Sequence, residues 1–521
     1  MTATVQLPLW LFVLILAFAA VTFASHFLLP SVRWFLRRRM ERLVAELNKR
    51  LERPIQPFKL MRRQDMIVRL IYDPQVMEAV VEHAHEQGVP ESVAFERARR
   101  YAREIVPSFS AGTYFGPAIR AARGLSRGLY KVRLGHHDEA VLRELDRKAA
   151  VVFVMNHRSN MDYVLVTYLV AERSALSYAV GEWARIWPLQ SLIRAMGAYF
   201  IRRRYLSPLY RRILARYVQM ATQEGVTQAI FPEGGLSLDG RVGPARKGLL
   251  HYIATGFRPG EGRDVVFVPV ALNYDRVLED RVLLNAAATG ERRFRARFPA
   301  ILGFVGRILW QRLRGRFRRF GYAGVSFGVP LSLDAFLRET PDAGTDALAE
   351  ALMDRIRAAM PVLPVPLVAA ALTAGGSGPQ AEGALVAQAE TWVSALRRGG
   401  CHVHLPDGMV AAAVREGLAA LAIRDIVRET PEGWVVRPED ASVLSFYAAS
   451  IAHLIASAAG LPAVPAPAPA EMRRPTHNCA RHIISTEGSC VLHCCAGIAI
   501  PALDPAPDSA MRRNHVRKPR R

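Results

Sequence analysis

Beyond residue 148 the sequence alternates short apolar runs with amphipathic stretches, and this alternation limits the folds that the chain can adopt. Strand-like runs lie at 149–155, 199–201, 227–231, 265–272 and 324–329. Helical spacing lies between them at 161–171, 189–196, 209–223 and 248–255. Because strands that alternate with helices pair mainly in parallel, we predict an α/β fold with a mixed, largely parallel sheet flanked by helices.

Regions with helical spacing flank this α/β pattern on both sides. Apolar positions recur among charges at 57–110, and helical spacing returns at 384–396, 409–421 and 443–456. After residue 460 the run LPAVPAPAPA begins a segment with the composition of a linker, for which we expect no fold. The predicted parts are an N-terminal segment at 1–32, a helical N-terminal domain at 33–130, an α/β domain at 131–345, a helical C-terminal domain at 346–460 and a disordered tail at 461–521.

The charge balance restricts the partners of the chain. Its 521 residues include 69 Lys and Arg against 46 Asp and Glu, a formal net charge of +23. Such an excess favours a negatively charged partner, which is nucleic acid, an anionic membrane surface or a phosphorylated small molecule. The apolar fraction of 51% excludes a chain that is disordered throughout.

Cysteine usage indicates a reducing compartment. Of the five cysteines only Cys401 lies outside the tail, so the main body is not built on disulfides. The tail cysteines lie near three histidines, but they form no C-x-x-C pair. We therefore expect a disordered tail there and no metal site.

The N-terminal segment has the composition of a membrane anchor. No residue from Met1 to Ser31 carries a formal charge, and the apolar stretch 7–29 is long enough to cross a hydrocarbon core of roughly 30 Å. Arginines at 33, 37, 38 and 39 follow the stretch, which predicts an uncleaved anchor with the rest of the chain in the cytoplasm. The alternative is an interfacial or re-entrant helix, which Pro8 and Pro30 permit.

The sharpest motif is the run from Asn156 to Asp162, NHRSNMD, which follows the apolar run VVFVM. His157 is therefore expected at the carboxyl end of a strand, where open α/β sheets bind ligands. Asp162 falls in the first turn of the next helix and can orient the imidazole as a general base. For this pair alone, a structural histidine in a loop is the commoner explanation.

Three further clusters follow along the chain. The run GAYFIRRR ends a strand with Arg202 and Arg203, whose guanidinium groups suit a phosphate. The run FPEGGLS and the residues after it form a second cluster, in which glycines let backbone amides approach a ligand. Its candidate binding residues are Glu233, Gly234, Gly235, Ser237, Arg241 and Arg246. The third cluster is an apolar strand that we expect Pro269 to kink.

In order and spacing these four motifs resemble those of the glycerolipid acyltransferases with an H-x4-D motif, over residues 150–335. Details such as HRS before MDY, and EGG in place of EGT, are more similar to the membrane-bound bacterial glycerol-3-phosphate acyltransferases. The segments SFY and SIAHL near residue 450 are similar to a C-terminal helix of the same enzymes. Two departures are Leu236, where the family has an arginine, and Pro244 with Arg246 and Lys247 in place of a Pro-Lys pair.

The resemblance implies an acyltransferase domain at 131–345. His157 is then expected to take the proton of the sn-1 hydroxyl of glycerol 3-phosphate, with Asp162 orienting it, and Pro269 to border an acyl channel. The implied donor is acyl-CoA or acyl carrier protein, with no cofactor, and the product is lysophosphatidate, made in the first step of phospholipid synthesis. The implied location is the cytoplasmic face of the cell membrane, with no nucleic-acid partner.

Three alternatives remain open from the sequence. The first is acylation of lysophosphatidate or another lysolipid by the same chemistry. The second is a non-catalytic basic tether on a membrane surface, and the third is a thioester hydrolase, which would not need the arginines. Residues 292–320 mix arginines with aromatic and aliphatic residues, which suits either an interfacial helix on anionic lipid or a basic face packed on the sheet.

Overall fold

The computed structural model of the chain describes residues 8–23, 29–134, 144–170, 174–181, 189–202, 207–290, 298–315, 317–376 and 378–459. The predicted disordered tail at 461–521 lies outside the described residues, and so do the cysteines within it.

One eight-stranded sheet organises the α/β part. Its strands are β1 (Lys131–Leu134), β2 (Ala150–Met155), β3 (Ser177–Gly181), β4 (Tyr199–Ile201), β5 (Gln228–Ile230), β6 (Val265–Tyr274), β7 (Tyr322–Phe327) and β8 (Leu331–Ser332). Their order is β1-β7-β6-β2-β5-β3-β4, and β8 pairs with β6. Strand β6 is antiparallel to β7 and β8, whereas the other pairs are parallel. The predicted mixed, largely parallel sheet is confirmed.

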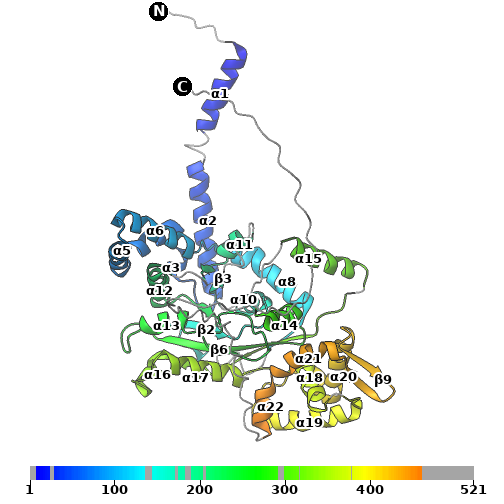
Figure 1. Cartoon of the computed structure of the whole chain (residues 1–521). Coiled ribbons are helices and arrows are strands. Elements are labelled where there is room, and N and C mark those ends of the chain that lie inside the picture. Colours follow the sequence, from blue (N-terminus) through cyan, green and yellow to red (C-terminus); the bar gives the residue numbers. More distant parts are fainter. Residues whose placement is uncertain are drawn as a thin grey trace, which may run out of the picture. The chain divides into compact units, whose positions relative to one another are not determined.

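The strands β2 and β6 are buried along their whole length. Continuous apolar strands of this kind are covered by helices on both faces. The helices of this part are α10 (Met161–Val170), α11 (Leu189–Ala195), α12 (Pro208–Gln223), α13 (Gly248–Thr255), α14 (Asp280–Thr289) and α15 (Phe298–Leu313). Figure 1 shows α10 on one side of the sheet and α17 (Thr345–Ala358) on the other. With both faces covered, ligands are expected at the carboxyl ends of the strands.

Helices also form the described residues before β1. They are α1 (Leu9–Phe23), α2 (Leu29–Arg50), α3 (Pro57–Leu60), α4 (Arg63–Ile71), α5 (Pro74–Gln87), α6 (Glu91–Ile105), α7 (Ala111–Thr113), the π-helix η2 (Tyr114–Ala118) and α8 (Ile119–Leu129). Asp73 joins this region to the α/β part. Its carboxylate accepts the Gln75 amide at 3.1 Å, which caps α5, and pairs with Arg216 of α12 at 2.8 Å.

A mainly helical region follows β8. It contains α16 (Leu333–Glu339), α17, α18 (Pro364–Ala374), α19 (Glu382–Arg398), α20 (Val410–Ala422), the hairpin of β9 (Val427–Thr430) and β10 (Gly433–Val436), α21 (Ala441–Ala449) and α22 (Ala452–Ala458). The first nine residues of α18 are buried, so α18 is a core helix of this region. Asp275, directly after β6, accepts the amides of Val365 in α18 and of Tyr322 at 2.9 and 2.7 Å. Burial raises the pKa of Asp275 to about 7.

Two differences from the sequence pattern concern short elements. The pattern did not predict β3, because Ala179 and Gly181 are residues that strands disfavour. The helical spacing at 443–456 belongs to two helices that are separated at Ser450. The Ser450 hydroxyl donates to the Tyr447 carbonyl at 2.7 Å and accepts from Asn273 of β6 at 3.2 Å. The helix therefore breaks where it meets the end of β6.

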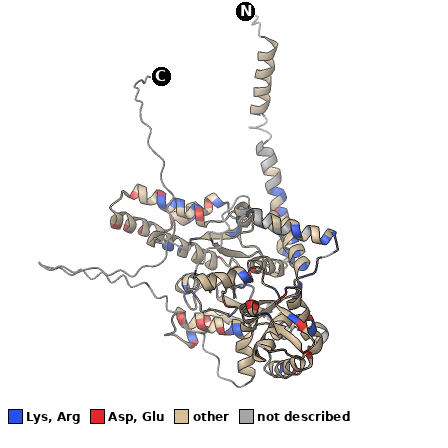
Figure 2. Cartoon of the chain, turned by 45° about the vertical axis from the view of Figure 1, so that its right-hand side comes forward, with Lys and Arg blue, Asp and Glu red and all other residues tan. Residues whose placement is uncertain are grey.

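The uncharged N-terminal segment includes the 15 residues of α1. In Figure 2 this helix next to the N-terminus is entirely tan, because it carries no charged side chain. Within the described ranges, no single helix is both long and apolar enough for a membrane span. One bent pair, Pro438–Ala449 with Ala452–Ala458 at 59°, passes by length and composition.

Phe267 of β6 is fully buried at the centre of the sheet. Replacing it by alanine leaves a cavity among side chains that cannot collapse into it. We expect Phe267→Ala to lower the free energy of unfolding by about 3–5 kcal/mol. Val282→Ala on the exposed face of α14 is the control, with a change within about 0.5 kcal/mol. Urea unfolding in detergent measures both, and equal losses would contradict the described core.

Candidate active site

Residues 156–160 connect β2 to α10, and Asn156 shapes this loop. The Asn156 side chain donates to the Leu272 carbonyl at 2.9 Å and accepts the Leu272 amide at 2.7 Å. The side-chain amide of Asn156 thus forms the two hydrogen bonds with β6 that a backbone peptide of β2 would otherwise form. The main chain after Asn156 is free to turn away from the sheet, and His157 lies at the carboxyl end of β2, as predicted.

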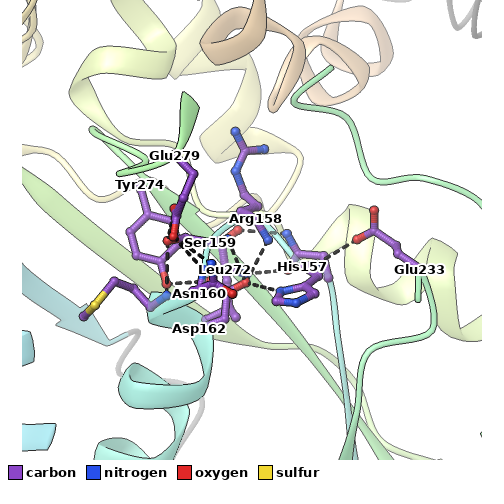
Figure 3. Close-up of polar contacts among 11 residues, drawn as sticks. His157, Arg158, Ser159, Asn160, Asp162, Glu233, Leu272, Tyr274 and Glu279 are labelled. Carbon is purple, nitrogen blue, oxygen red and sulfur yellow. Dashed lines mark hydrogen bonds and ion pairs between the residues drawn. The ribbon is translucent and has the colours of Figure 1, made fainter. Parts of the chain in front are cut away.

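The His157 ring and the Asp162 carboxylate form a buried pair (Figure 3). Nδ1 of His157 lies 2.9 Å from Oδ2 of Asp162, and the same oxygen accepts the amides of Arg158 and Ser159 at 2.7 and 3.0 Å. Because Oδ2 already accepts two amide hydrogens, it is an acceptor toward the ring as well. Nδ1 is therefore the donor in this contact and carries the ring proton. No described residue hydrogen bonds to Nε2, which leaves that nitrogen available as a base.

Two residues that sequence reasoning did not single out support this pair. The Tyr274 hydroxyl, at the end of β6, donates to Oδ1 of Asp162 at 2.6 Å. Burial, and then the charge of Asp162, raise the pKa of Tyr274, so its proton stays in this hydrogen bond. Glu279 accepts from the Ser159 hydroxyl at 2.8 Å and from the Asn160 side chain at 3.1 Å. The available signal for Tyr274 was its position two residues after the predicted strand 265–272, whereas Glu279, the N-cap of α14, had no such signal.

Aromatic rings limit the orientation of the imidazole. The ring of Phe231 lies 4.3 Å from that of His157 at 32°, and Tyr163 packs edge-on at 5.3 Å. Phe231 and Tyr163 also contact each other, with centroids 4.8 Å apart. This packing holds the ring in one plane and lowers the polarity around it.

Glu233 ties the glycine turn, residues 233–243, to the main chain of His157. Its Oε1 accepts the His157 amide at 2.9 Å and its Oε2 accepts the Gly243 amide at 3.1 Å. Burial raises the pKa of Glu233 to about 7. Both carboxylate oxygens thus already bind protein amides, and the predicted contact with a polyol hydroxyl would use their remaining lone pairs.

The predicted residues Gly234, Gly235 and Ser237 lie in this turn. Gly234 has φ +65°, and a Cβ there would lie 2.8 Å from Cδ of Arg246. The Ser237 amide donates to the His157 carbonyl at 2.8 Å, and its hydroxyl donates to the Arg241 carbonyl at 2.7 Å. Ser237 therefore stabilises the turn. At Gly234 the positive φ favours glycine, because a side chain there would strain the backbone.

The predicted arginines are not all brought together. Arg246 is exposed beside Gly234, and Arg241 is half-buried in the same turn. Arg202 follows β4, three strands along from β2, and its guanidinium donates to both Glu104 oxygens at 2.9 and 2.7 Å. This contact with Glu104 raises the pKa of Arg202. Arg203 lies outside the described residues.

Pro269 is buried in β6, between the residues that pair with β8 and those that pair with β7. A proline has no amide hydrogen to donate, and this gap in the pairing tolerates it. The Pro269 carbonyl accepts the Gly328 amide at 2.8 Å. The acyl channel predicted beside Pro269 stays a prediction.

Two family models match the chain. One, described as Acyltransferase, matches residues 136–273, which include His157, Asp162 and Glu233. The other, described as Glycerol-3-phosphate acyltransferase C-terminal region, matches residues 308–464.

Curated relatives agree with these matches. A glycerol-3-phosphate acyltransferase of Aeromonas hydrophila is 28% identical over 433 residues, 76% of this chain and 51% of the relative. Another, of Pseudomonas entomophila, is 26% identical over 426 residues, 76% of this chain and 49% of the relative. The chain spans about half the length of these relatives. Among solved structures, a 1-acyl-sn-glycerophosphate acyltransferase of Thermotoga maritima matches with a TM-score of 0.28 and 16% identity, over 50% of this chain and 80% of that one.

The buried carboxyl group of Glu233 makes stability depend on pH. Its pKa is about 7 in the folded chain against an ordinary value of 4.5, so the folded chain holds the proton more tightly. Its stabilising contribution is full below about pH 4.5 and is lost as the pH rises through about 7, by at most about 3 kcal/mol. The stability of the wild type relative to Glu233→Gln should therefore fall over this range. Urea unfolding at several pH values measures it, and a constant difference would contradict the raised pKa.

Proposed function

Because family models of acyltransferases match residues 136–273 and 308–464, we propose that the chain transfers a fatty acyl group from acyl-CoA or acyl carrier protein to the sn-1 hydroxyl of glycerol 3-phosphate. The product would be lysophosphatidate. The C-terminal family match and the names of the curated relatives support glycerol 3-phosphate as the acceptor.

The observation that carries the proposal is the contact of 2.9 Å between His157 Nδ1 and Asp162. In the proposed reaction Nε2 removes the hydroxyl proton while the oxygen attacks the thioester carbonyl. The carboxylate then stabilises the imidazolium that forms. The thiolate of the carrier leaves and takes the proton from the imidazolium, and the reaction needs neither an acyl-enzyme nor a cofactor.

The phosphate of the acceptor requires cationic partners. We propose Arg241 and Arg246 for this role, because both belong to or border the glycine turn that Glu233 ties to His157. Arg202 would bind the phosphate only after giving up its contacts with Glu104. A phosphate can replace that carboxylate, because it offers the same bidentate geometry. Arg203 remains part of this proposal.

We further propose that the enzyme acts on the cytoplasmic face of a membrane, which would receive its amphiphilic product. The uncharged helix α1 supports an anchor. Helix α15 supports a second contact, because Trp310 and Leu313 are exposed there and Arg314 stacks over the Trp310 ring at 4.1 Å. Exposed aromatic and aliphatic side chains among arginines suit the headgroup region of an anionic bilayer.

His157→Ala tests the proposed base. The variant should lose about 10²–10⁴-fold in turnover with glycerol 3-phosphate and an acyl thioester, because alanine cannot accept the proton. His251→Ala, an exposed histidine of α13, is the matched control and should keep wild-type activity. An assay in detergent that compares both carriers, and glycerol 3-phosphate with lysophosphatidate and glycerol, measures the outcome. Unchanged turnover in His157→Ala would exclude His157 as the general base.

A fluorophore on Leu313→Cys, with the native cysteines replaced by serine, tests the contact of α15 with lipid. In vesicles of anionic phospholipid we expect a quencher on the acyl chains to quench this fluorophore. The control is Val329→Cys, an exposed apolar position in the loop after β7, where we expect no quenching. Equal quenching at the two positions would argue against a lipid contact of α15.

A further inference from the structure

Arg158 is a buried arginine that the proposed chemistry does not use. It is 1% exposed and directly follows the base. Its Nη1 donates to the Gly240 carbonyl at 2.5 Å, whereas Nε and Nη2 have no hydrogen-bond partner among the described residues. Its guanidinium carbon lies 5.2 Å from the centre of the Phe446 ring, a cation–π contact. In Figure 3 the side chain leads away from the His157 ring, so it does not extend toward Nε2.

The two partners of Arg158 also contact each other. Gly240 has φ +84°, and a Cβ there would lie 1.9 Å from the Phe446 carbonyl oxygen. The glycine turn and α21 therefore meet backbone to backbone, at a distance that permits no side chain. Arg158, Gly240 and Phe446 together form what we call the Arg158 junction.

The junction is connected to the base through the main chain. The Arg158 amide donates to Asp162 at 2.7 Å. The turn that contains Gly240 binds both sides of the His157 peptide, since the His157 amide donates to Glu233 and the His157 carbonyl accepts the Ser237 amide at 2.8 Å. A shift of the turn would therefore move His157 relative to Asp162.

Helix α21 is itself held by the segment that follows β6 and by the first residue of α14. The Tyr447 hydroxyl donates to Asp280 at 2.6 Å and accepts the Val277 amide at 3.0 Å. Arg424 also contacts Asp280, at 2.5 Å. These bonds fix the position of Phe446 relative to the segment that directly follows Tyr274, the residue that donates to Asp162.

A buried guanidinium with two unpartnered nitrogens is costly, and no described carboxylate forms an ion pair with it. Burial lowers the pKa of Arg158. A methionine of similar length would avoid this cost, so stability alone does not account for an arginine here.

We propose that Arg158 is a positioning residue, through which α21 of the C-terminal region holds the glycine turn and the His157–Asp162 pair in working geometry. This inference rests on the proposed function. In this proposal the C-terminal region contributes to turnover and not to binding of the acceptor.

Arg158→Met tests the proposal by separating kcat from KM. We expect kcat to fall by at least about tenfold, since small misplacements of a base cost up to about 10²-fold, and KM for the acceptor to stay within about twofold. Arg158→Lys keeps the charge and should restore part of kcat. A rise in KM with unchanged kcat would mean that Arg158 binds the ligand, and would overturn the proposal.

A double-mutant cycle tests the route through α21. Phe446→Leu alone should lower kcat, and adding it to Arg158→Met should cost little more, because both remove the same contact. Additive losses would overturn the route. Gly240→Ala should also lower kcat, whereas Gly260→Ala, with a similar φ of +75° and no atom near its Cβ, should not. Equal effects of the two glycine variants would exclude the junction, and thermal melting of each variant identifies one that fails to fold.

A readout without turnover keeps this test separate from that of the proposed function. In spectra of ¹⁵N-histidine-labelled protein, assigned with His157→Asn, the Nδ1 proton of His157 should be protected from exchange by Asp162. We expect Arg158→Met to lose this protection and Gly260→Ala to keep it. Retained protection in Arg158→Met would overturn the positioning role, whatever acceptor the wild type uses.

Discussion

The carboxylate of Asp162 is the interaction on which the candidate site depends. It accepts from the His157 ring, the Arg158 and Ser159 amides and the Tyr274 hydroxyl, at distances of 2.6 to 3.0 Å. A fully buried charge is tolerated because these donors replace the water that it has lost. The same contacts decide which nitrogen of His157 carries the proton and how the loop after β2 turns. One side chain thus controls both the shape and the chemistry of the site.

The end of β6 connects this carboxylate to the C-terminal region. Three consecutive residues there make different contacts. The Asn273 side chain donates to Ser450 at 3.2 Å, and the Tyr274 hydroxyl donates to Asp162. Asp275 accepts the Val365 amide in the first turn of α18. Because side chains alternate along a strand, one strand end can serve the site and the neighbouring helices together. Through this strand end the C-terminal region is connected to the residues of the candidate site.

Much of the fold and of the candidate site could be predicted from the sequence, because strand and helix periods are local properties. The runs at 149–155 and 265–272 correspond to β2 and β6, and the position of His157 at a strand end followed from them. The spacing of five residues to Asp162 placed the carboxylate in the first turn of α10. β3 was not predicted, since its alanine and glycine are residues that strands disfavour. Its place between β5 and β4 depends on pairing with residues distant in the chain.

By itself the sequence determined the α/β class, the order of the motifs and the pairing of His157 with Asp162, because these depend on short separations along the chain. Only the tertiary structure decided which arginines have partners. Arg202 binds Glu104, 98 residues earlier, whereas Arg158 contacts Phe446 and has no acidic partner among the described residues. Both are arginines at strand ends with the same local signal. Their difference lies in which distant residues the fold brings within about 3 Å, because hydrogen bonds and ion pairs act only at such distances.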